Sequence, residues 1–211
     1  MASGRAPDDP TPPADLAART LLLTTIQEPA WRVYPGDHRP LHFNRQDGRF
    51  NDPRRQDGVL YAAGTDVAAF AERLLLAAGL IMGPVGAANG VRVPVSATTL
   101  ETFALATITF AQPLTCVDLR TPSGLTQIGA GPWLLTAPHS VSTQWSRPLF
   151  MHPSAPEGIV WSSRVGQAVI SVGLHERARP KITAKGLGPL IRHRRLLADA
   201  IRRFGLVITP G

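Results

Sequence analysis

Apolar positions occur in short runs along most of the chain, and proline or glycine separates one run from the next. Short alternating or continuous apolar runs bounded in this way are typical of strands, whereas an apolar stripe with a period of three to four residues is typical of helices. We therefore predict strands at residues 33–34, 58–63, 103–109, 114–119, 158–161, 168–172 and 206–209. Helices are predicted at residues 15–27, from Thr65 or Asp66 to about residue 78, at 140–149 and at 187–204. Strands and helices mix without a regular strand–helix–strand repeat, which predicts an α+β fold.

Two stretches fall outside this pattern. Residues 1–13 are polar and rich in proline, so we expect them to be disordered within an N-terminal extension of residues 1–28. Residues 29–211 are then expected to form one domain. From Pro35 to Asp57 the chain is polar and lacks periodicity, and long loops in compact domains usually carry function.

The composition favours a cytoplasmic protein without membrane contact. With 211 residues, 44% of them apolar, the chain can bury a substantial core. No apolar stretch follows a basic flank at the start, so no secretory signal is predicted. The uncharged segment 74–91 is interrupted by Pro84, Asn89 and glycines, which argues against a membrane-spanning helix. Cys116 lies in an apolar run and is expected to be buried.

The formal charge of +7 raises the question of nucleic-acid binding. The richest basic run, residues 192–203, flanks apolar residues at helical spacing, as a solvated helix face does. Charge alone supports only non-specific attraction, so direct nucleic-acid binding is the minority interpretation.

Several familiar catalytic motifs are absent from the sequence. It has no G-x-S-x-G elbow, no phosphate-binding P-loop and no H-E-x-x-H motif. His38 and His42 lie in a proline-bounded loop without a neighbouring cysteine or carboxylate cluster, so no metal site is predicted. His139 and His175 are expected to be structural.

Four polar residues within about forty positions form the candidate site: Arg32, Arg49, Tyr61 and Glu72. A guanidinium binds a pyrophosphate through paired hydrogen bonds, and a tyrosine ring can stack on a heteroaromatic ring. A carboxylate stabilises the positive charge that develops on a ribose as its glycosidic bond breaks. Together these groups predict cleavage of NAD⁺.

The four residues lie in a series of segments that follow one another along the chain: Trp31-Arg32-Val33, Gly48-Arg49-Phe50-Asn51, Gly58-Val59-Leu60-Tyr61-Ala62-Ala63, Ala68-Ala69-Phe70-Ala71-Glu72, the helix around Ser140 to Ser146, and Gly158-Ile159-Val160-Trp161-Ser162-Ser163-Arg164. In order and spacing these segments resemble the RES domain family, which is named for its arginine, glutamate and serine. The resemblance spans roughly residues 29–209. Where the family usually has tyrosine, two residues before its serine, this chain has Trp161.

The resemblance implies a fold similar to ADP-ribosyltransferases, with a mixed or antiparallel sheet core and flanking helices. It also implies a toxin-type enzyme of a bacterial toxin–antitoxin pair that depletes NAD⁺. NAD⁺ is then the substrate, and no separate cofactor is expected. The implied partner is an Xre-type helix-turn-helix antitoxin, and contact with nucleic acid would be only indirect, through that antitoxin.

Each candidate residue has an expected role. Glu72 is the catalytic carboxylate, and Ser163 hydrogen-bonds Glu72 or the ribose, with Ser162 as the alternate serine. Arg32 and Arg49 clamp the pyrophosphate, and Tyr61 stacks on nicotinamide.

The sequence leaves three questions open. The acceptor at C1 of the ribose is water in a glycohydrolase and phosphate in a phosphorylase, and the residues do not choose between them. ADP-ribosyl transfer to a protein target is a second enzymatic interpretation. A non-catalytic, basic binding module built on the same scaffold is the alternative from another class.

Overall fold

The computed structural model describes residues 10–46, 48–76, 79, 92–163 and 169–211. The strands are β1 (Leu23–Ile26), β2 (Ala30–Pro35), β3 (Val59–Ala63), β4 (Val93–Ser96), β5 (Phe103–Phe110), β6 (Leu114–Asp118), β7 (Gly158–Ser162), β8 (Ile170–His175), β9 (Ile182–Pro189) and β10 (Leu206–Thr209). The α-helices are α1 (Asp66–Phe70), α2 (Ala97–Thr102), α3 (Pro122–Ile128), α4 (His139–Phe150) and α5 (Arg194–Phe204). A π-helical segment, η2 (Ala71–Leu76), continues α1, and short 3₁₀ turns are η1 (Leu16–Ala18), η4 (Pro132–Leu135), η5 (Glu176–Lys181) and η6 (Leu190–Arg192).

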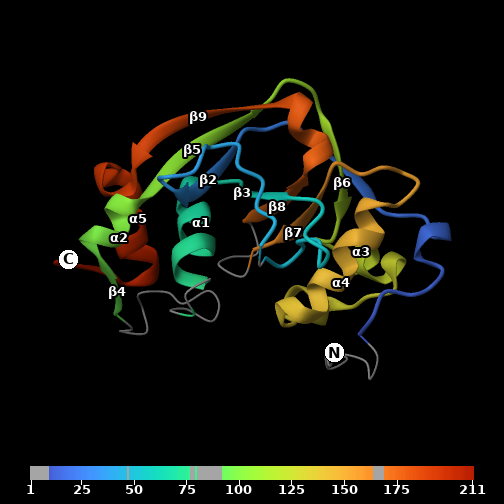
Figure 1. Cartoon of the computed structure of the whole chain (residues 1–211). Coiled ribbons are helices and arrows are strands. Elements are labelled where there is room, and N and C mark those ends of the chain that lie inside the picture. The colour runs from blue at the N-terminus through green and yellow to red at the C-terminus, as the bar shows by residue number, and fades with distance from the viewer. Residues whose placement is uncertain (1–9, 47, 77–78, 80–91, 164–168) are drawn as a thin grey trace.

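One eight-stranded sheet organises the molecule, in the order β1-β6-β7-β8-β3-β2-β5-β9. Neighbouring strands are antiparallel except for β6 and β7, which are parallel. The sheet curls into an arch, with α1 and α5 beneath one half and α3 and α4 beneath the other (Figure 1). A second, two-stranded parallel sheet pairs β10 with β4 beside α5. The predicted α+β fold class is confirmed.

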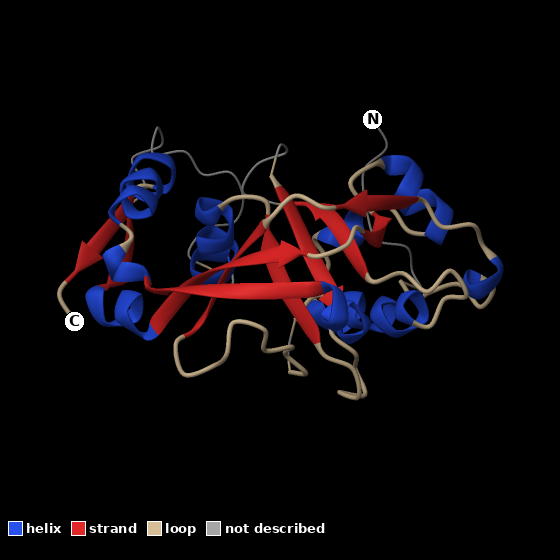
Figure 2. Cartoon of the chain, turned by 90° about the horizontal axis from the view of Figure 1, so that it is seen from above, coloured by secondary structure: helices blue, strands red, loops and turns tan. Residues whose placement is uncertain are grey.

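Two apolar clusters lie on the same face of the large sheet. Partners across a sheet share a face, and the register aligns Trp161, Ser171, Ala63 and Trp31 in one row. At the Trp31 end, side chains of α1, η2 and α5 pack on the sheet. At the Trp161 end, side chains of α3 and α4 do so. The middle of the row therefore lies between two groups of helices, which Figure 2 shows from above as separate clusters along the sheet.

The other face of the sheet carries its own apolar cluster. Leu60, Ala62, Val160 and Val172 alternate with the residues of the first face and are buried on this side. Cys116 on β6 belongs to the same cluster and is fully buried, as predicted from its apolar run, and burial raises the pKa of its thiol to about 12.

Most predicted elements are present with slightly different ends. The helix expected to start at Thr65 or Asp66 begins with Thr65 as its cap, because the Thr65 side chain accepts a hydrogen bond from the Ala68 amide. The helix expected at 140–149 spans His139–Phe150, and the final strand has the predicted bounds. Part of the predicted strand 168–172 and the end of the helix predicted to about residue 78 lie outside the described residues.

The helix predicted at residues 15–27 is wrong. Only η1 is helical there, Asp15 makes no side-chain cap, and residues 23–26 form the edge strand β1, paired with β6. Thr24, Thr25 and Ile26 are branched at Cβ, which favours extended structure, and their alternate exposure fits a strand. The sheet thus takes a strand from the predicted N-terminal extension, while the predicted disorder of residues 1–13 falls mainly on residues outside the description.

The helix predicted at residues 187–204 is partly wrong. Its first residues belong to β9, and the α-helix starts only at Arg194. Gly186, Gly188 and Pro189 disfavour a helix, and Gly188 has a φ of +90°, which suits glycine.

The structure contains no helix, within the part of the chain that it describes, with the length and apolar character needed to cross a bilayer. The uncharged segment 74–91 lies mostly outside that part.

His175 is a buried histidine at the end of β8, with 1% of its surface exposed. Within the part of the chain that the structure describes, its Nε2 has no hydrogen-bond partner, and its Nδ1 lies 3.4 Å from the carbonyl oxygen of Pro156. The ring meets Phe150 edge-on, with centroids 4.8 Å apart. Burial is the main cause that lowers the pKa of His175 from 6.5 to about 4.

This histidine should make the fold sensitive to acid. Because the folded-state pKa lies below the unfolded value, its contribution is complete above pH 6.5 and is lost as the pH falls toward 4. We expect a loss of about 3 kcal/mol from this group across that window. Urea unfolding at pH 7.5, 5.5 and 4.5 should show a smaller acid loss in His175→Leu than in the wild type. The exposed His38, changed to Gln, is the control; an equal pH slope in wild type and His175→Leu would contradict the assignment.

Candidate active site

Glu72 lies just after the point where the helix that begins as α1 changes from α-helical to π-helical. After α1 ends at Phe70, the chain continues as the π-helical segment η2, and Glu72 is the second residue of that segment. π-helical turns are rare and often occur at functional sites. The segment buries Leu74, Leu75 and Leu76, while Glu72 stays half-buried. The helix therefore fixes a carboxylate at the margin of a packed core.

Two serine hydroxyls hold this carboxylate. Ser163 Oγ donates to Glu72 Oε1 at 2.5 Å, and Ser171 Oγ donates to the same oxygen at 3.2 Å. Ser163 follows β7, and its amide donates to the Val169 carbonyl; Ser171 lies within β8. The fold thus joins the predicted pair Glu72 and Ser163, which are 91 positions apart in the sequence.

The geometry also separates Ser163 from its neighbour Ser162. Ser162 pairs with Ile170, the position next to Ser171, so alternation along the strands directs it to the other face. Of the two serines, only Ser163 contacts Glu72 in the described structure.

Tyr61 lies beside this cluster on the same face of the sheet. It is two residues from Ala63 on β3, and Ala63 pairs with Ser171. Its hydroxyl donates to Asn51 Oδ1 at 2.6 Å and accepts from the Phe50 amide at 2.9 Å, and burial raises its pKa. The hydroxyl therefore anchors the segment Gly48–Asn51, a role that the sequence did not predict.

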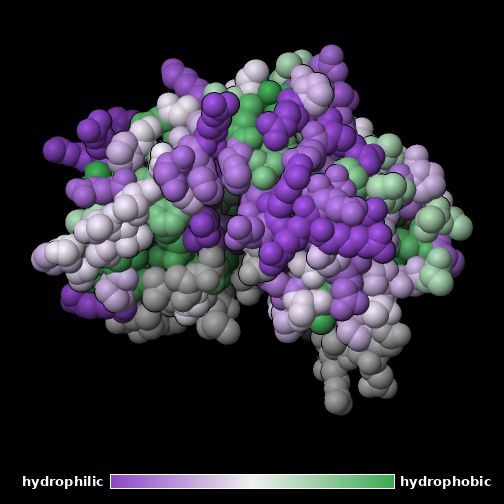
Figure 3. All heavy atoms as spheres, viewed as in Figure 1, coloured by the Kyte–Doolittle hydropathy of each residue, from purple (hydrophilic) through white to green (hydrophobic). Residues whose placement is uncertain are grey.

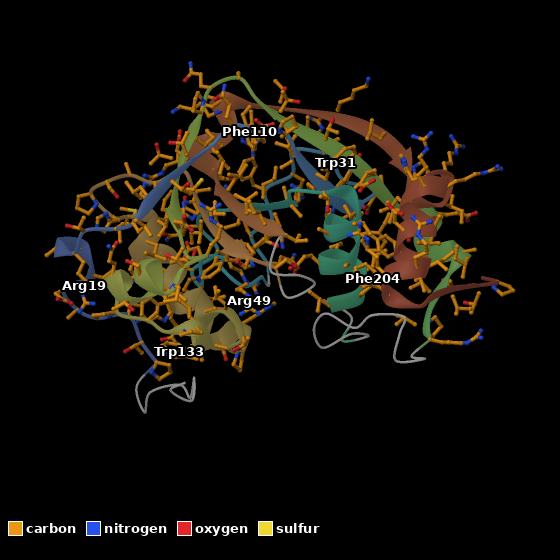
Figure 4. All side chains as sticks on the ribbon, turned by 180° about the vertical axis from the view of Figure 1, so that it is seen from behind. Arg19, Trp31, Arg49, Phe110, Trp133 and Phe204 are labelled. Atoms are coloured by element: carbon orange, nitrogen blue, oxygen red, sulfur yellow. The ribbon has the colours of Figure 1, made fainter. Side chains whose placement is uncertain are left out.

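Arg49 belongs to that anchored segment. Its Nη1 donates to the carbonyl oxygens of Ala137 at 3.0 Å and Leu134 at 3.3 Å, just before α4. Ser146 of α4 donates to the Phe50 carbonyl at 2.5 Å and ties the segment to the same helix. In Figure 4, Arg49 lies next to α4, on the side that faces α1. The positive charge of Arg49 opposes part of the rise in the pKa of Tyr61 that burial causes.

Arg32 does not join this group. On β2 it alternates with Trp31, so its side chain leaves the strand on the face that carries Tyr34, whose ring centroid lies 6.0 Å from the guanidinium. Arg32 is 93% buried, and its Nη1 has no hydrogen-bond partner among the described residues. Burial first, and the charge of Arg73 second, lower its pKa to about 10. The predicted clamp of Arg32 with Arg49 is therefore not assembled on one face, a difference that spacing along the sequence does not reveal.

Trp161 packs against Phe50 and Tyr61. Its ring meets Phe50 at 5.3 Å and Tyr61 at 6.2 Å between centroids, both edge-on. It thus occupies the row that contains Ser171 and supports Tyr61 from the side. Sequence reasoning missed Ser171, and it named Asn51 and Trp161 only within the matching segments, without the contacts that they make here. The signal available for Ser171 was a polar residue within an apolar strand.

The described residues contain no group of three histidine, cysteine or carboxylate side chains placed to hold a metal ion. The rings of His38 and His42 lie 4.3 Å apart, against each other. The site therefore rests on Glu72, its serines, Tyr61 and Arg49. Figure 3 shows mainly hydrophilic side chains over the middle of the visible face.

Comparison with known proteins identifies the family. The RES domain family matches residues 29–196. The chain is 34% identical over 116 residues to "Probable toxin y4kH" of Sinorhizobium fredii (strain NBRC 101917 / NGR234), a match that covers 54% of this chain and 90% of that protein. The protein thus belongs to the RES domain family.

A solved structure shares the fold. The crystal structure of the M. tuberculosis MbcT–MbcA toxin–antitoxin complex contains a chain that matches with a TM-score of 0.58 and 18% identity, over 82% of this chain and 92% of that one. At this identity the likeness shows the fold alone, and it agrees with the curled, mostly antiparallel sheet described above.

Proposed function

We propose that this protein is a toxin-type enzyme that cleaves the bond between nicotinamide and ribose in NAD⁺. The observation that carries the proposal is the Glu72 carboxylate, held by Ser163 and Ser171 between two groups of helices. Bond cleavage at the ribose passes through an oxocarbenium-like state. A carboxylate that is already oriented stabilises this positive charge without having to reorganise, so it lowers the barrier more than it strengthens substrate binding.

Arg49 and Tyr61 supply the proposed contacts to the rest of the substrate. A guanidinium fixed by carbonyl oxygens and by a tethered backbone presents a planar cation to a pyrophosphate. The Tyr61 ring is proposed to contact nicotinamide, while its hydroxyl keeps Arg49 in place. Arg32 is kept as a separate candidate for an anionic group, because its buried Nη1 makes no hydrogen bond to the described residues.

The acceptor separates two forms of the reaction. With water the products are nicotinamide and ADP-ribose, and with phosphate they are nicotinamide and ADP-ribose 1″-phosphate. Incubation of the purified protein with NAD⁺, with and without phosphate, followed by mass spectrometry of the products, decides between them. Label from NAD⁺ that ends on protein would instead support ADP-ribosyl transfer.

The names of the similar proteins suggest an antitoxin as the partner. One relative is named a probable toxin, and the structural neighbour is part of a toxin–antitoxin complex. We propose that a cognate antitoxin, of the Xre helix-turn-helix type, neutralises this protein. The loop between Arg32 and Tyr61 is proposed to be part of the contact, because it carries Arg49 and several exposed arginines that can bind a carboxylate of the partner.

Expression in bacteria tests the toxin proposal. We expect the wild-type protein alone to arrest growth and lower cellular NAD⁺, because an enzyme that destroys NAD⁺ is not self-limiting. Glu72→Gln at the same soluble level should relieve both effects, and so should co-expression of a cognate antitoxin. Normal growth with constant NAD⁺ at verified soluble levels of wild type would count against the toxin function and favour a non-catalytic binding module.

A further inference from the structure

We propose that Ser171 is a positioning residue for Glu72, in addition to the serine that the family motif supplies. This inference rests on the proposed function, since it concerns the orientation of the carboxylate assigned to catalysis. Ser171 has 2% of its surface exposed and donates to Glu72 Oε1 at 3.2 Å.

The two serine bonds select one orientation of the carboxylate. The last torsion of a glutamate side chain has a broad, weak preference, so a carboxylate without fixed donors rotates readily. Here both donors meet the same oxygen, Oε1: Ser163 from just beyond the end of β7, and Ser171 from within β8. A carboxylate held in this way directs Oε2 away from the serines, which defines the oxygen that is presented to the ribose.

The surroundings of Ser171 explain why a hydroxyl is present there. Ser171 lies within β8, in register with Ala63 on one side and Trp161 on the other, among residues that bury apolar surface. A buried hydroxyl costs free energy unless it is hydrogen-bonded, and the acceptor of Ser171 is Glu72. An alanine would fit the packing of this row, so the serine is explained by its bond to the carboxylate.

Ser163 and Ser171 are held differently. Ser163 lies one residue beyond the end of β7, whereas Ser171 is within a strand that pairs with β3 and β7 on both sides. Ser163 makes the shorter hydrogen bond to Glu72, and Ser171 connects the carboxylate to the centre of the sheet. Sites of this kind depend on such supporting contacts for their geometry.

Steady-state kinetics with NAD⁺ test this role. Ser171→Ala should lower kcat about tenfold and leave KM within about twofold, because it removes one hydrogen bond to a charged group and no contact to substrate. Ser171→Cys, close in size but a weak donor, should show the same loss. Ser171→Thr keeps the hydroxyl and should retain most of the activity. Ser162→Ala, on the other face, is the matched control and should match the wild type.

The result that overturns the role is a kcat within about twofold of wild type in both folded Ser171→Ala and Ser171→Cys. A change confined to KM overturns it as well, because it would make Ser171 a substrate contact. If the wild type does not consume NAD⁺, the proposed function fails, and crystal structures of wild type and Ser171→Ala test the positioning by themselves. We expect the Glu72 carboxylate to rotate or to split into two orientations in the variant; one unchanged orientation overturns the inference.

Discussion

Glu72→Gln is expected to lower the rate of NAD⁺ consumption by about 10²–10³-fold, the usual effect of removing one preorganised electrostatic contact. The amide is nearly the same size and still accepts a hydrogen bond, so Ser163 and Ser171 retain an acceptor. What the variant loses is the negative charge that faces the developing positive charge on the ribose. Release of nicotinamide, followed by chromatography, measures the rate, and circular dichroism checks the fold.

Glu101→Gln is the matched control, because Glu101 is an exposed glutamate on α2. It removes the same charge from the chain and should consume NAD⁺ at the wild-type rate. Equal activity in Glu72→Gln and wild type would remove Glu72 from the catalytic role.

Gly48→Ala is expected to cost at least tenfold in activity, because Gly48 begins the segment that carries Arg49. A Cβ there would lie 2.3 Å from Asn51 Oδ1 and 2.9 Å from the Tyr61 hydroxyl, closer than any ordinary contact. The substitution must displace the hydrogen bond between Tyr61 and Asn51, and overpacking of this kind typically costs about 1–3 kcal/mol. Affinity for NAD⁺, from calorimetry on a Glu72→Gln background, should fall as Arg49 moves.

Gly64→Ala provides the control for adding a methyl group near the same strand. Gly64 follows β3, and the nearest atoms to its Cβ would be 3.8 Å away, an ordinary contact. This variant should bind and turn over NAD⁺ like the wild type. Unchanged affinity in Gly48→Ala would mean that Tyr61 and Asn51 do not position a substrate-binding arginine.

The sequence predicted the elements whose patterns are local. Apolar runs between proline, glycine or polar residues predict four of the strands, β3, β5, β6 and β7. Thr65 predicts the start of α1 as its cap. The proline after Thr121 is also a helix-start signal, and it marks α3, which the prediction missed. The local pattern predicts a helix across β1, because the strand character of these residues depends on pairing with β6, about ninety residues later.

The candidate site also contains residues that the sequence predicts and contacts that depend on the fold. Glu72 and Ser163 are brought together as the family order implies, although their contact depends on the sheet. Arg32 and Trp31 are neighbours in sequence and leave opposite faces of β2, so identity and spacing do not tell which of them faces the site. The bond between Tyr61 and Asn51 follows from the path of the long loop, which has no periodicity to read.

The two groups of helices each hold one charged residue of the site. Glu72 is attached to the cluster of α1 and α5, whereas Arg49 is attached to the turn before α4. Ser171 and Tyr61 lie on the sheet between them. A ligand that contacts both Glu72 and Arg49 must therefore bridge the two halves of one sheet face, as an extended dinucleotide can.

The central claim is tested most directly by incubating the purified protein with NAD⁺ and following free nicotinamide by proton NMR, with Glu72→Gln measured beside it. The account predicts that the wild type releases nicotinamide in amounts that exceed the enzyme many times over, and that the folded variant is slower by about 10²–10³-fold. Intact NAD⁺ after prolonged incubation with folded wild type, in the presence and in the absence of phosphate, would contradict it.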